Sequence, residues 1–214
     1  LEVVGNPVRP ALAALAGQGY APPAEDGAIR LLVLGGSLGA RIFADVVPAA
    51  IAALPEALRG RLVVTQQTRA EDLPRVETAY REAGVPADLS PFFGDIATRL
   101  AMAHIVVARA GASTVAELAC AGRPSILVPL PNAIDDHQTA NARSLAAVGA
   151  AWLMPQPAFT PEALARQLGV VLASPAVLAR AAAAAAQEAR PDAARRLADL
   201  VQSLIRAAAP LESR

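Results

Sequence analysis

Short, continuously apolar runs alternate with longer stretches of helical periodicity over residues 29–153. The runs lack the apolar–polar alternation of a strand with one face in water, so each is expected to be buried on both sides. The predicted strands are 29–34, 61–65, 87–89, 104–108, 125–128 and 150–153, and the predicted helices between them are 40–54, 70–83, 95–101, 113–121 and 136–148. This order predicts an α/β fold with a parallel sheet covered on both faces. Right-handed crossovers then favour a doubly wound, Rossmann-like sheet of about six strands.

The segments on either side of this alternation are predicted to be helical, at 10–17, 161–172, 175–189 and 192–208. Pro48 lies inside the predicted helix 40–54, where it removes a backbone hydrogen bond and predicts a kink or an interruption. Asp95 is expected to cap the helix that follows it. The chain opens on Leu1 rather than Met, in what looks like the middle of a pattern, so we expect a fragment of a larger protein.

The composition narrows the function classes. Hydrophobic residues make up 54% of the chain but aromatic residues only 3%, so the core is expected to be aliphatic. The 19 basic and 19 acidic residues cancel without a basic stripe, which disfavours nucleic acid as a partner. The single cysteine, Cys120, excludes a disulfide within the chain and is interpreted as a small core residue. No apolar run reaches the ~18 residues of a membrane-spanning helix, and no signal-peptide pattern is present.

The first candidate phosphate site is the turn Gly35-Gly36-Ser37-Leu38-Gly39-Ala40, between the first strand and its helix. Glycines permit a tight turn and close backbone approach, and the positive end of the helix dipole favours an anion. The spacing is not the G-x-G-x-x-G of dinucleotide sites, and no Walker lysine follows, so NAD binding and P-loop chemistry are disfavoured. An ordinary turn between strand and helix is the alternative.

The second candidate is Arg109-Ala-Gly-Ala-Ser-Thr-Val-Ala-Glu-Leu-Ala-Cys-Ala-Gly122, which follows the fourth strand. Gly111 ends the strand, Ser113 or Thr114 can cap the helix, and the bare N–H groups of the helix start suit a phosphate. Glu117 has two interpretations. With Thr114 it has the spacing of a capping box, in which the carboxylate reaches back to a backbone N–H. Alternatively, the carboxylate accepts hydrogen bonds from both hydroxyls of a ribose.

A third polar segment, Asp135-Asp-His-Gln-Thr-Ala-Asn141, opens the helix after the fifth strand and is expected to face the same cleft. The amide of Gln138 suits sugar hydroxyls. His137 ranks below it as a base, because a histidine in a first helical turn is commonly exposed or capping, and His104 is interpreted as structural. The adjacent acids at 135 and 136 are explained by the helix dipole, and no His or Cys lies at ligand spacing, so no metal site is predicted.

Taken in order, five motifs resemble those of the bacterial MurG family, the peptidoglycan glycosyltransferases of family 28. They are Gly5-Asn-Pro-Val-Arg9, Gly35-Gly-Ser-Leu-Gly-Ala-Arg41, Pro91-Phe-Phe-Gly-Asp95, Arg109-Ala-Gly-Ala-Ser-Thr-Val-Ala-Glu117, and His137-Gln138 with Asn141-Ala142. The resemblance implies a GT-B fold of two Rossmann-like domains, with this chain as the carboxyl-terminal, donor-binding half. Residues 1–28 would then be the interdomain connection and lead-in, 29–190 the UDP-GlcNAc-binding domain, and 191–214 a helix packing toward the other domain.

The resemblance also implies which residues bind the donor. They are Arg9 for the nucleotide sugar, Ser37 for the diphosphate, the Phe93 backbone for the uracil edge, Ala112, Ser113 and Thr114 for the phosphates, Glu117 for the ribose and Gln138 for the GlcNAc hydroxyls. Further candidates are Gly36, Gly39, Gly111, His137 and Asn141. Three positions depart from the family pattern: Leu38 and His137 each replace a glutamine, and Gln66 replaces a histidine after the second strand.

The reaction that the resemblance implies is an inverting, metal-independent transfer of N-acetylglucosamine from UDP-GlcNAc to the muramoyl 4-hydroxyl of lipid I, which forms lipid II. The helix starts at 37 and 113–114 would stabilise the charge that develops on the β-phosphate as UDP leaves. No cofactor and no catalytic residue is expected in this chain; the base is expected in the other domain, and the fragment alone is expected to be inactive. The lipid acceptor implies a peripheral place on the cytoplasmic face of the bacterial inner membrane.

Other functions are compatible with parts of this pattern. A UDP-GlcNAc 2-epimerase also binds UDP at a strand-end glycine turn, but it needs acid/base carboxylates near the sugar C2, and the sequence offers no convincing pair. A non-catalytic nucleotide-sugar-binding subunit of a membrane glycosyltransferase is a further alternative. A glycolipid-forming sister enzyme is the third, although the Asn-Pro-Val-Arg and Gly-Ala-Ser-Thr-Val-x-Glu combination favours the peptidoglycan family.

Overall fold

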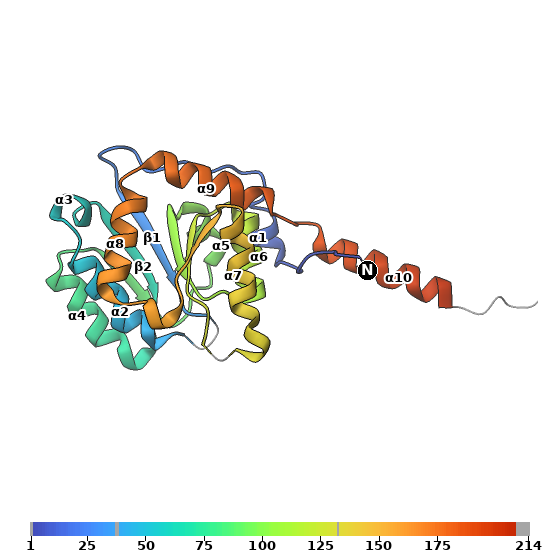
Figure 1. Cartoon of the computed structure of the whole chain (residues 1–214), viewed down its shortest axis with the longest axis horizontal. Helices are drawn as coiled ribbons and strands as arrows, with labels where there is room; N and C mark the ends of the chain where they lie inside the picture. The colour runs from blue at the N-terminus through green and yellow to red at the C-terminus, as the bar shows by residue number, and fades with distance from the viewer. Residues whose placement is uncertain (1, 37–38, 132, 209–214) are drawn as a thin grey trace, which may run out of the picture.

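A computed structural model of the chain describes residues 2–36, 39–131 and 133–208. Six parallel strands form one sheet in the order β3-β2-β1-β4-β5-β6 (Figure 1). The strands are β1 (Ile29–Leu34), β2 (Leu62–Gln67), β3 (Ala87–Ser90), β4 (Ile105–Ala108), β5 (Ser125–Leu127) and β6 (Ala151–Leu153). The chain moves outward from β1 to β3, returns to β4 beside β1, and continues to the other edge. This confirms the predicted doubly wound sheet. The order in which the chain adds strands reverses between β1 and β4, and the carboxyl ends of these two strands mark the switch point.

Helices cover the sheet from both sides (Figure 1). They are α1 (Pro10–Ala13), α2 (Arg41–Ala52), α3 (Glu56–Arg59), α4 (Leu73–Glu82), α5 (Ile96–Met102), α6 (Ala112–Ala121), α7 (His137–Ala147), α8 (Pro161–Leu172), α9 (Pro175–Gln187) and α10 (Ala193–Ala208), with short 3-10 turns at η1 (Ala70–Asp72), η2 (Ile134–Asp136) and η3 (Gln156–Ala158). Successive residues of β1 point to opposite faces. Leu31 and Val33 join a core with α2, α4 and α8, whereas Leu32 joins a second core with α1, α5, α6, α7 and α9.

One local prediction is wrong, and of the kink or interruption predicted at Pro48, the interruption does not occur. Asp95 precedes α5 but caps none of its N–H groups; its Oδ1 accepts a hydrogen bond from Arg99 Nε at 2.7 Å instead. The charged partner one turn along the helix has replaced the backbone donor. The helix α2 runs through Pro48 without the interruption that the proline predicted. Pro48 is buried, and packing of the helix against the core outweighs the loss of one hydrogen bond.

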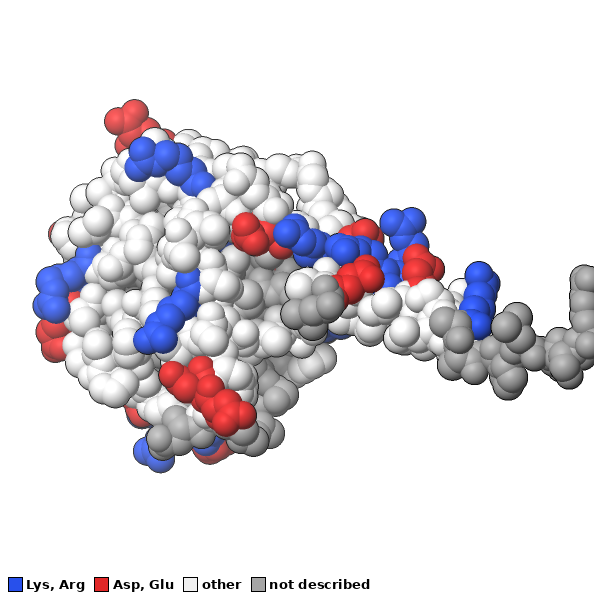
Figure 2. Space-filling model, turned by 45° about the vertical axis from the view of Figure 1, so that its right-hand side comes forward, with Lys and Arg blue, Asp and Glu red and all other residues white. Residues whose placement is uncertain are grey.

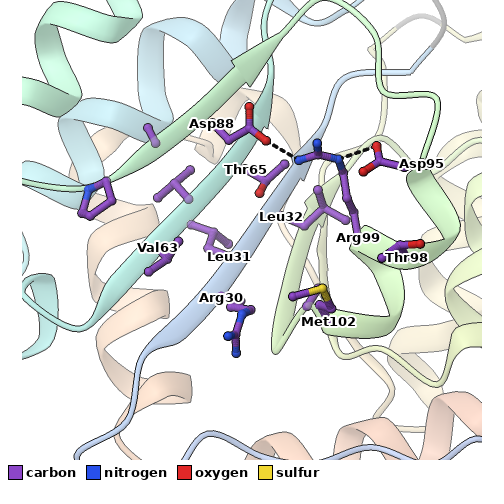
Figure 3. A pocket seen from close by; sticks show the side chains of 14 residues that line it. Arg30, Leu31, Leu32, Val63, Thr65, Asp88, Asp95, Thr98, Arg99 and Met102 are labelled. Carbon is purple, nitrogen blue, oxygen red and sulfur yellow. Dashed lines mark hydrogen bonds and ion pairs between the residues drawn. The ribbon is translucent and has the colours of Figure 1, made fainter.

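The expectation that both faces are covered fails over β2 and β3. On the side of α5, an open groove of about 520 Å³ runs across β1, β2 and β3 (Figure 3). Val63 is 39% exposed there and Met102 52%. Arg99 bridges the groove by pairing with Asp88 and Asp95 (Figure 3). β2 therefore alternates between buried and exposed residues, which its sequence does not show.

The last described helix, α10, projects from the body of the domain beside the N-terminal residues (Figure 1). Arg196 holds the two together, since its Nη2 donates to the Val3 carbonyl at 3.2 Å and lies 3.9 Å from Glu2. Charged side chains gather where α10 leaves the domain (Figure 2). Among the described residues, no single helix has the length and apolarity to cross a membrane, although α8 and α9 together, bent by 93°, meet that test on length and composition.

Candidate functional site

Two adjoining hollows lie at the carboxyl ends of the central strands. The larger, about 730 Å³, lies between the β1–α2 turn, the start of α6 and the start of α7. The smaller, about 410 Å³, lies between Arg9, the Phe92–Phe93 loop and the first turns of α6. Gly36, Ser113 and Thr114 line both hollows, so together they form one cleft at the point where the strand order reverses.

The backbone of the β1–α2 turn is tightly folded. A Cβ on Gly35 would lie 2.4 Å from the Ala40 nitrogen, so only glycine fits at that position. Gly36 and Gly39 have φ values of +83° and +67°, and the Gly39 N–H donates to the Gly36 carbonyl at 3.0 Å. Ser37, predicted to hold the diphosphate, and Leu38 lie outside the described residues.

Two helices begin at the larger hollow without side-chain caps. α2 follows Ala40 and α6 follows Gly111, and neither of these N-cap residues has a side chain that accepts a hydrogen bond from the helix it precedes. The prediction that Ser113 or Thr114 caps α6 is wrong, because both lie inside its first turn. Backbone N–H groups at a helix start carry partial positive charge and suit an anion. Two such helix starts lining one hollow favour a diphosphate.

The hydrogen bonds of Glu117 exclude one of the two interpretations of its role. Its Oε1 accepts hydrogen bonds from Arg9, at 3.0 Å from Nη2 and 3.3 Å from Nε, rather than from the start of its own helix. The capping-box interpretation is therefore wrong. The side chain of Glu117 is only 15% exposed and lines the smaller hollow, whereas that of Arg9 is 60% exposed. Arg9 thus holds the carboxylate at the wall of the smaller hollow.

The other predicted site residues divide into those that line the cleft and those that do not. Phe93 lines the smaller hollow and is 8% exposed, with the Arg99 guanidinium 4.1 Å from its ring centroid. Gln138 lines the larger hollow, and its Oε1 accepts from the Leu130 N–H at 3.0 Å. Asn141 is not among the lining residues; its Nδ2 donates to the Ala110 carbonyl at 3.0 Å and supports the turn before α6. The exposed His137 is not among them either.

Gln67 holds the cleft together and was missed by the sequence analysis. Its Oε1 accepts from the Gly35 N–H at 3.1 Å, and its Nε2 donates to the carbonyls of Gly36 at 3.0 Å and Pro91 at 3.1 Å. It therefore joins the β1–α2 turn to the loop that carries Phe93. Gln66, the position that departs from the family pattern, points to the opposite face of β2, is fully buried and accepts from the Tyr80 hydroxyl.

Arg109 is a second supporting residue. Its Nη1 donates to the carbonyls of Val128 at 3.1 Å and Pro129 at 3.0 Å, and its Nη2 donates to Gln156 Oε1 at 2.6 Å. Its guanidinium also lies 5.3 Å from the centroid of the Phe43 ring. Burial lowers the pKa of this arginine. Arg109 therefore fixes the loop after β5, which forms the far wall of the larger hollow.

His104 has the structural role that its position suggested. Its Nδ1 accepts from the Arg30 N–H at 3.0 Å, and its backbone carbonyl accepts from the Tyr20 hydroxyl at 2.9 Å. Burial, with the positive charges of Arg30 and Arg123, lowers the pKa of His104 and favours the neutral ring that this hydrogen bond requires. Across the part of the chain that the structure describes, no cluster of three His, Cys, Asp or Glu side chains is arranged to hold a metal ion.

A doubly wound parallel sheet with two helix starts at its switch point defines a Rossmann-like α/β domain. Comparison with known proteins identifies the family of this domain. The chain belongs to the family described as the glycosyltransferase family 28 C-terminal domain, whose model matches residues 30–197. The family predicted from the motifs is thereby confirmed.

Individual relatives agree with this assignment. The UDP-N-acetylglucosamine--N-acetylmuramyl-(pentapeptide) pyrophosphoryl-undecaprenol N-acetylglucosamine transferase of Granulibacter bethesdensis is 61% identical over 209 residues, covering 97% of this chain and 54% of that protein. The protein of the same name from Rhodospirillum rubrum is 57% identical over 201 residues, covering 94% and 52%. The chain therefore spans about half the length of the curated relatives it matches.

Solved structures show the same architecture. The crystal structure of Acinetobacter baumannii MurG matches with a TM-score of 0.77 and 36% identity, covering 86% of this chain and 55% of that chain. The UDP-GlcNAc 2-epimerase of Neisseria meningitidis, solved with UDP-GlcNAc bound, matches with a TM-score of 0.55 but only 10% identity, covering 84% and 45%. The second likeness shows the fold alone.

Proposed function

We propose that this chain is the donor-binding half of an enzyme that transfers N-acetylglucosamine from UDP-GlcNAc to the muramoyl 4-hydroxyl of lipid I, forming lipid II in peptidoglycan synthesis. One observation carries the proposal: two helix starts without an N-cap side-chain bond share a hollow that continues to the largely buried carboxylate of Glu117. This arrangement suits a diphosphate joined to a ribose. The names of the relatives and the family assignment supply the sugar and the acceptor.

The two hollows suggest how the donor lies. The diphosphate would be bound between the β1–α2 turn and the N–H groups of Ala112, Ser113 and Thr114. The uridine would extend into the smaller hollow, with the ribose on Glu117 and the base against the Phe93 loop. The GlcNAc would lie on the opposite side, toward Gln138. Ser113 and Thr114 line both hollows, which supports a ligand that passes from one to the other.

The mechanism we infer is a single displacement with inversion. The acceptor hydroxyl attacks the anomeric carbon, the bond from that carbon to the β-phosphate oxygen breaks, and its electron pair leaves with UDP. The helix starts of α2 and α6 stabilise the growing negative charge on the phosphate. The base that takes the hydroxyl proton belongs to the other half of the enzyme, because Glu117 is the sole carboxylate among the described residues that line the cleft. The same observation disfavours an epimerase, which needs acid/base groups around the sugar.

The remaining parts of the proposal concern the rest of the enzyme. The relatives extend well beyond this chain, and we propose that their additional half binds lipid I. Residues 1–28 would connect the two halves, 29–190 would bind UDP-GlcNAc, and α10 would pack toward the other half. A lipid acceptor would place the enzyme at the cytoplasmic surface of the bacterial inner membrane.

The test separates binding from transfer. Isothermal calorimetry of this chain should show binding of UDP-GlcNAc and UDP. The complete enzyme with a lipid I analogue should release UDP and form the disaccharide, whereas the chain alone should transfer nothing. Absence of UDP-GlcNAc binding by both forms, or conversion of UDP-GlcNAc to UDP-ManNAc, would contradict the proposal. Transfer by the isolated chain would overturn its assignment as half of an enzyme.

A further inference from the structure

Three arginines line the larger hollow, and their surroundings differ. Arg109 is held by two carbonyls and by Gln156, as described above. The side chain of Arg41 is 73% exposed and lies 3.8 Å from Asp45, its neighbour one turn along α2. Arg69 follows the end of β2 and projects to the β1–α2 turn. Of the three, Arg69 is the one with a buried guanidinium nitrogen that has no hydrogen-bond partner among the described residues.

The stem of Arg69 packs against the turn. A Cβ on Gly39 would lie 3.0 Å from Arg69 Cγ and 3.7 Å from its Nε, so the small glycine allows the arginine to lie directly beside the turn. This contact fixes where the guanidinium stands relative to Gly36 and the start of α2. The positively charged group is thereby built into the wall of the hollow.

The guanidinium of Arg69 has few polar partners among the described residues. Its Nε is buried without a hydrogen-bond partner among the described residues. Its Nη1 lies 3.7 Å from Glu71 Oε1, and the two side chains are 38% and 69% exposed, so this ion pair contributes little. A buried N–H without an acceptor is costly and uncommon in proteins. Its place beside an anion-favouring turn indicates that the acceptor is a ligand.

We infer that Arg69 is a further binding residue for the donor diphosphate, donating to its non-bridging oxygens from the side opposite α6. This inference rests on the proposed function. A guanidinium suits the role because it is planar, always charged and able to donate two parallel hydrogen bonds to a phosphate. When the bond from the sugar to the β-phosphate oxygen breaks, the electron pair stays on the UDP. Arg69 then stabilises the added charge beside the helix starts.

The experiment compares UDP with uridine, since only UDP carries the phosphates. In the complete enzyme, Arg69→Met should weaken UDP binding by about ten-fold to a hundred-fold and leave uridine binding unchanged. Arg69→Lys should recover part of the loss, because it restores the charge but not the paired donors. Arg81→Ala, which removes an exposed arginine on α4, is the matched control and should bind both ligands as the unaltered enzyme does.

Thermal unfolding without ligand shows whether Arg69 binds the diphosphate or stabilises the fold. The melting temperature of Arg69→Met should stay the same or rise, since the substitution removes an unpartnered buried donor. UDP affinity equal to that of the unaltered enzyme, or equal losses of UDP and uridine binding with a lower melting temperature, would overturn the inference and leave the proposed function intact. Failure of the unaltered enzyme to bind UDP would overturn both.

Discussion

Glu117 illustrates why a local spacing is insufficient to assign a side chain. The Thr-x-x-Glu pattern by itself favours a capping box and also permits a ribose contact. Arg9, which lies 108 residues away in the sequence, excludes the capping box, because its Nη2 donates to the carboxylate at 3.0 Å. Arg9 occupies the lead-in to the domain, so the ion pair also joins that segment to the floor of the cleft. A contact between residues so far apart follows from the fold and from no local pattern.

We expect Glu117→Gln to impair donor binding and leave folding almost unchanged. In the complete enzyme, the KM for UDP-GlcNAc should rise about ten-fold, because a neutral amide is a weaker acceptor for the ribose hydroxyls. The unfolding free energy of the chain should fall by less than about 1 kcal/mol, since Arg9 is largely exposed. Glu77→Gln, on the exposed side of α4, serves as the control. An unaltered KM together with a clear loss of stability would show that the carboxylate is structural.

The contrast between Gln66 and Gln67 shows a second limit of prediction from the sequence. A strand places successive side chains on opposite faces, so one of these residues had to face the core and the other the open side. The sequence shows no alternation in β2 that reveals which is which. Gln66 is buried beside Tyr80, and Gln67 binds both loops of the cleft. The departure at Gln66 therefore leaves the cleft lining unaltered.

The β1–α2 turn was recognisable from the sequence as an element, because three glycines separate a strand from a helix. The sequence does not tell which glycine is required or for what reason. Gly35 is constrained by close approach to the Ala40 nitrogen, whereas a Cβ on Gly36 would meet no atom of the described residues within 4 Å, and the constraint there is its φ of +83°. These are different physical demands, and they predict different consequences of adding one methyl group.

We expect Gly35→Ala to cost about 3 kcal/mol of unfolding free energy, because the backbone of the turn must move to admit the Cβ. UDP binding should be lost with it, since the turn positions the start of α2. Gly36→Ala should cost only about 1 kcal/mol through backbone strain. Urea unfolding of the two variants measures the difference. Equal costs would show that the turn adapts to a side chain at position 35.

Most of the strands were predictable because they are short, largely apolar runs bounded by glycine, proline or polar residues. The uncovered face of β2 and β3 was not, because it depends on where α5 lies in space. Asp88 and Asp95 come from separate elements and meet at Arg99, and this cluster supports the loop of Phe93. Long-range pairing of this kind sets the shape of the cleft, while hydrophobic periodicity sets only the order of its elements.

Besides the groove over β2 and β3, the described chain leaves an apolar side of α10 uncovered. The apolar residues of α10 recur with helical spacing along one side, and Leu197, Val201, Leu204 and Ile205 are 40%, 46%, 60% and 64% exposed. The helix projects away from the sheet, so its own domain does not cover this stripe (Figure 1). A helix with one apolar side gains most of its stability from packing that side against another part of the protein. This supports the proposal that α10 packs toward the other half of the enzyme.

The prediction for the whole molecule compares the stability of the complete enzyme with that of the isolated chain. Replacing both Leu204 and Ile205 with glutamine should lower the unfolding free energy of the complete enzyme by about 2–4 kcal/mol, because two buried side chains lose their apolar contacts. The isolated chain should keep its melting temperature, since both residues are exposed there. Replacing Gln202 and Ser203 with alanine, on the opposite side of α10, should leave both forms unaltered. An equal loss in both forms, or none in the complete enzyme, would refute the packing of α10 against the other half.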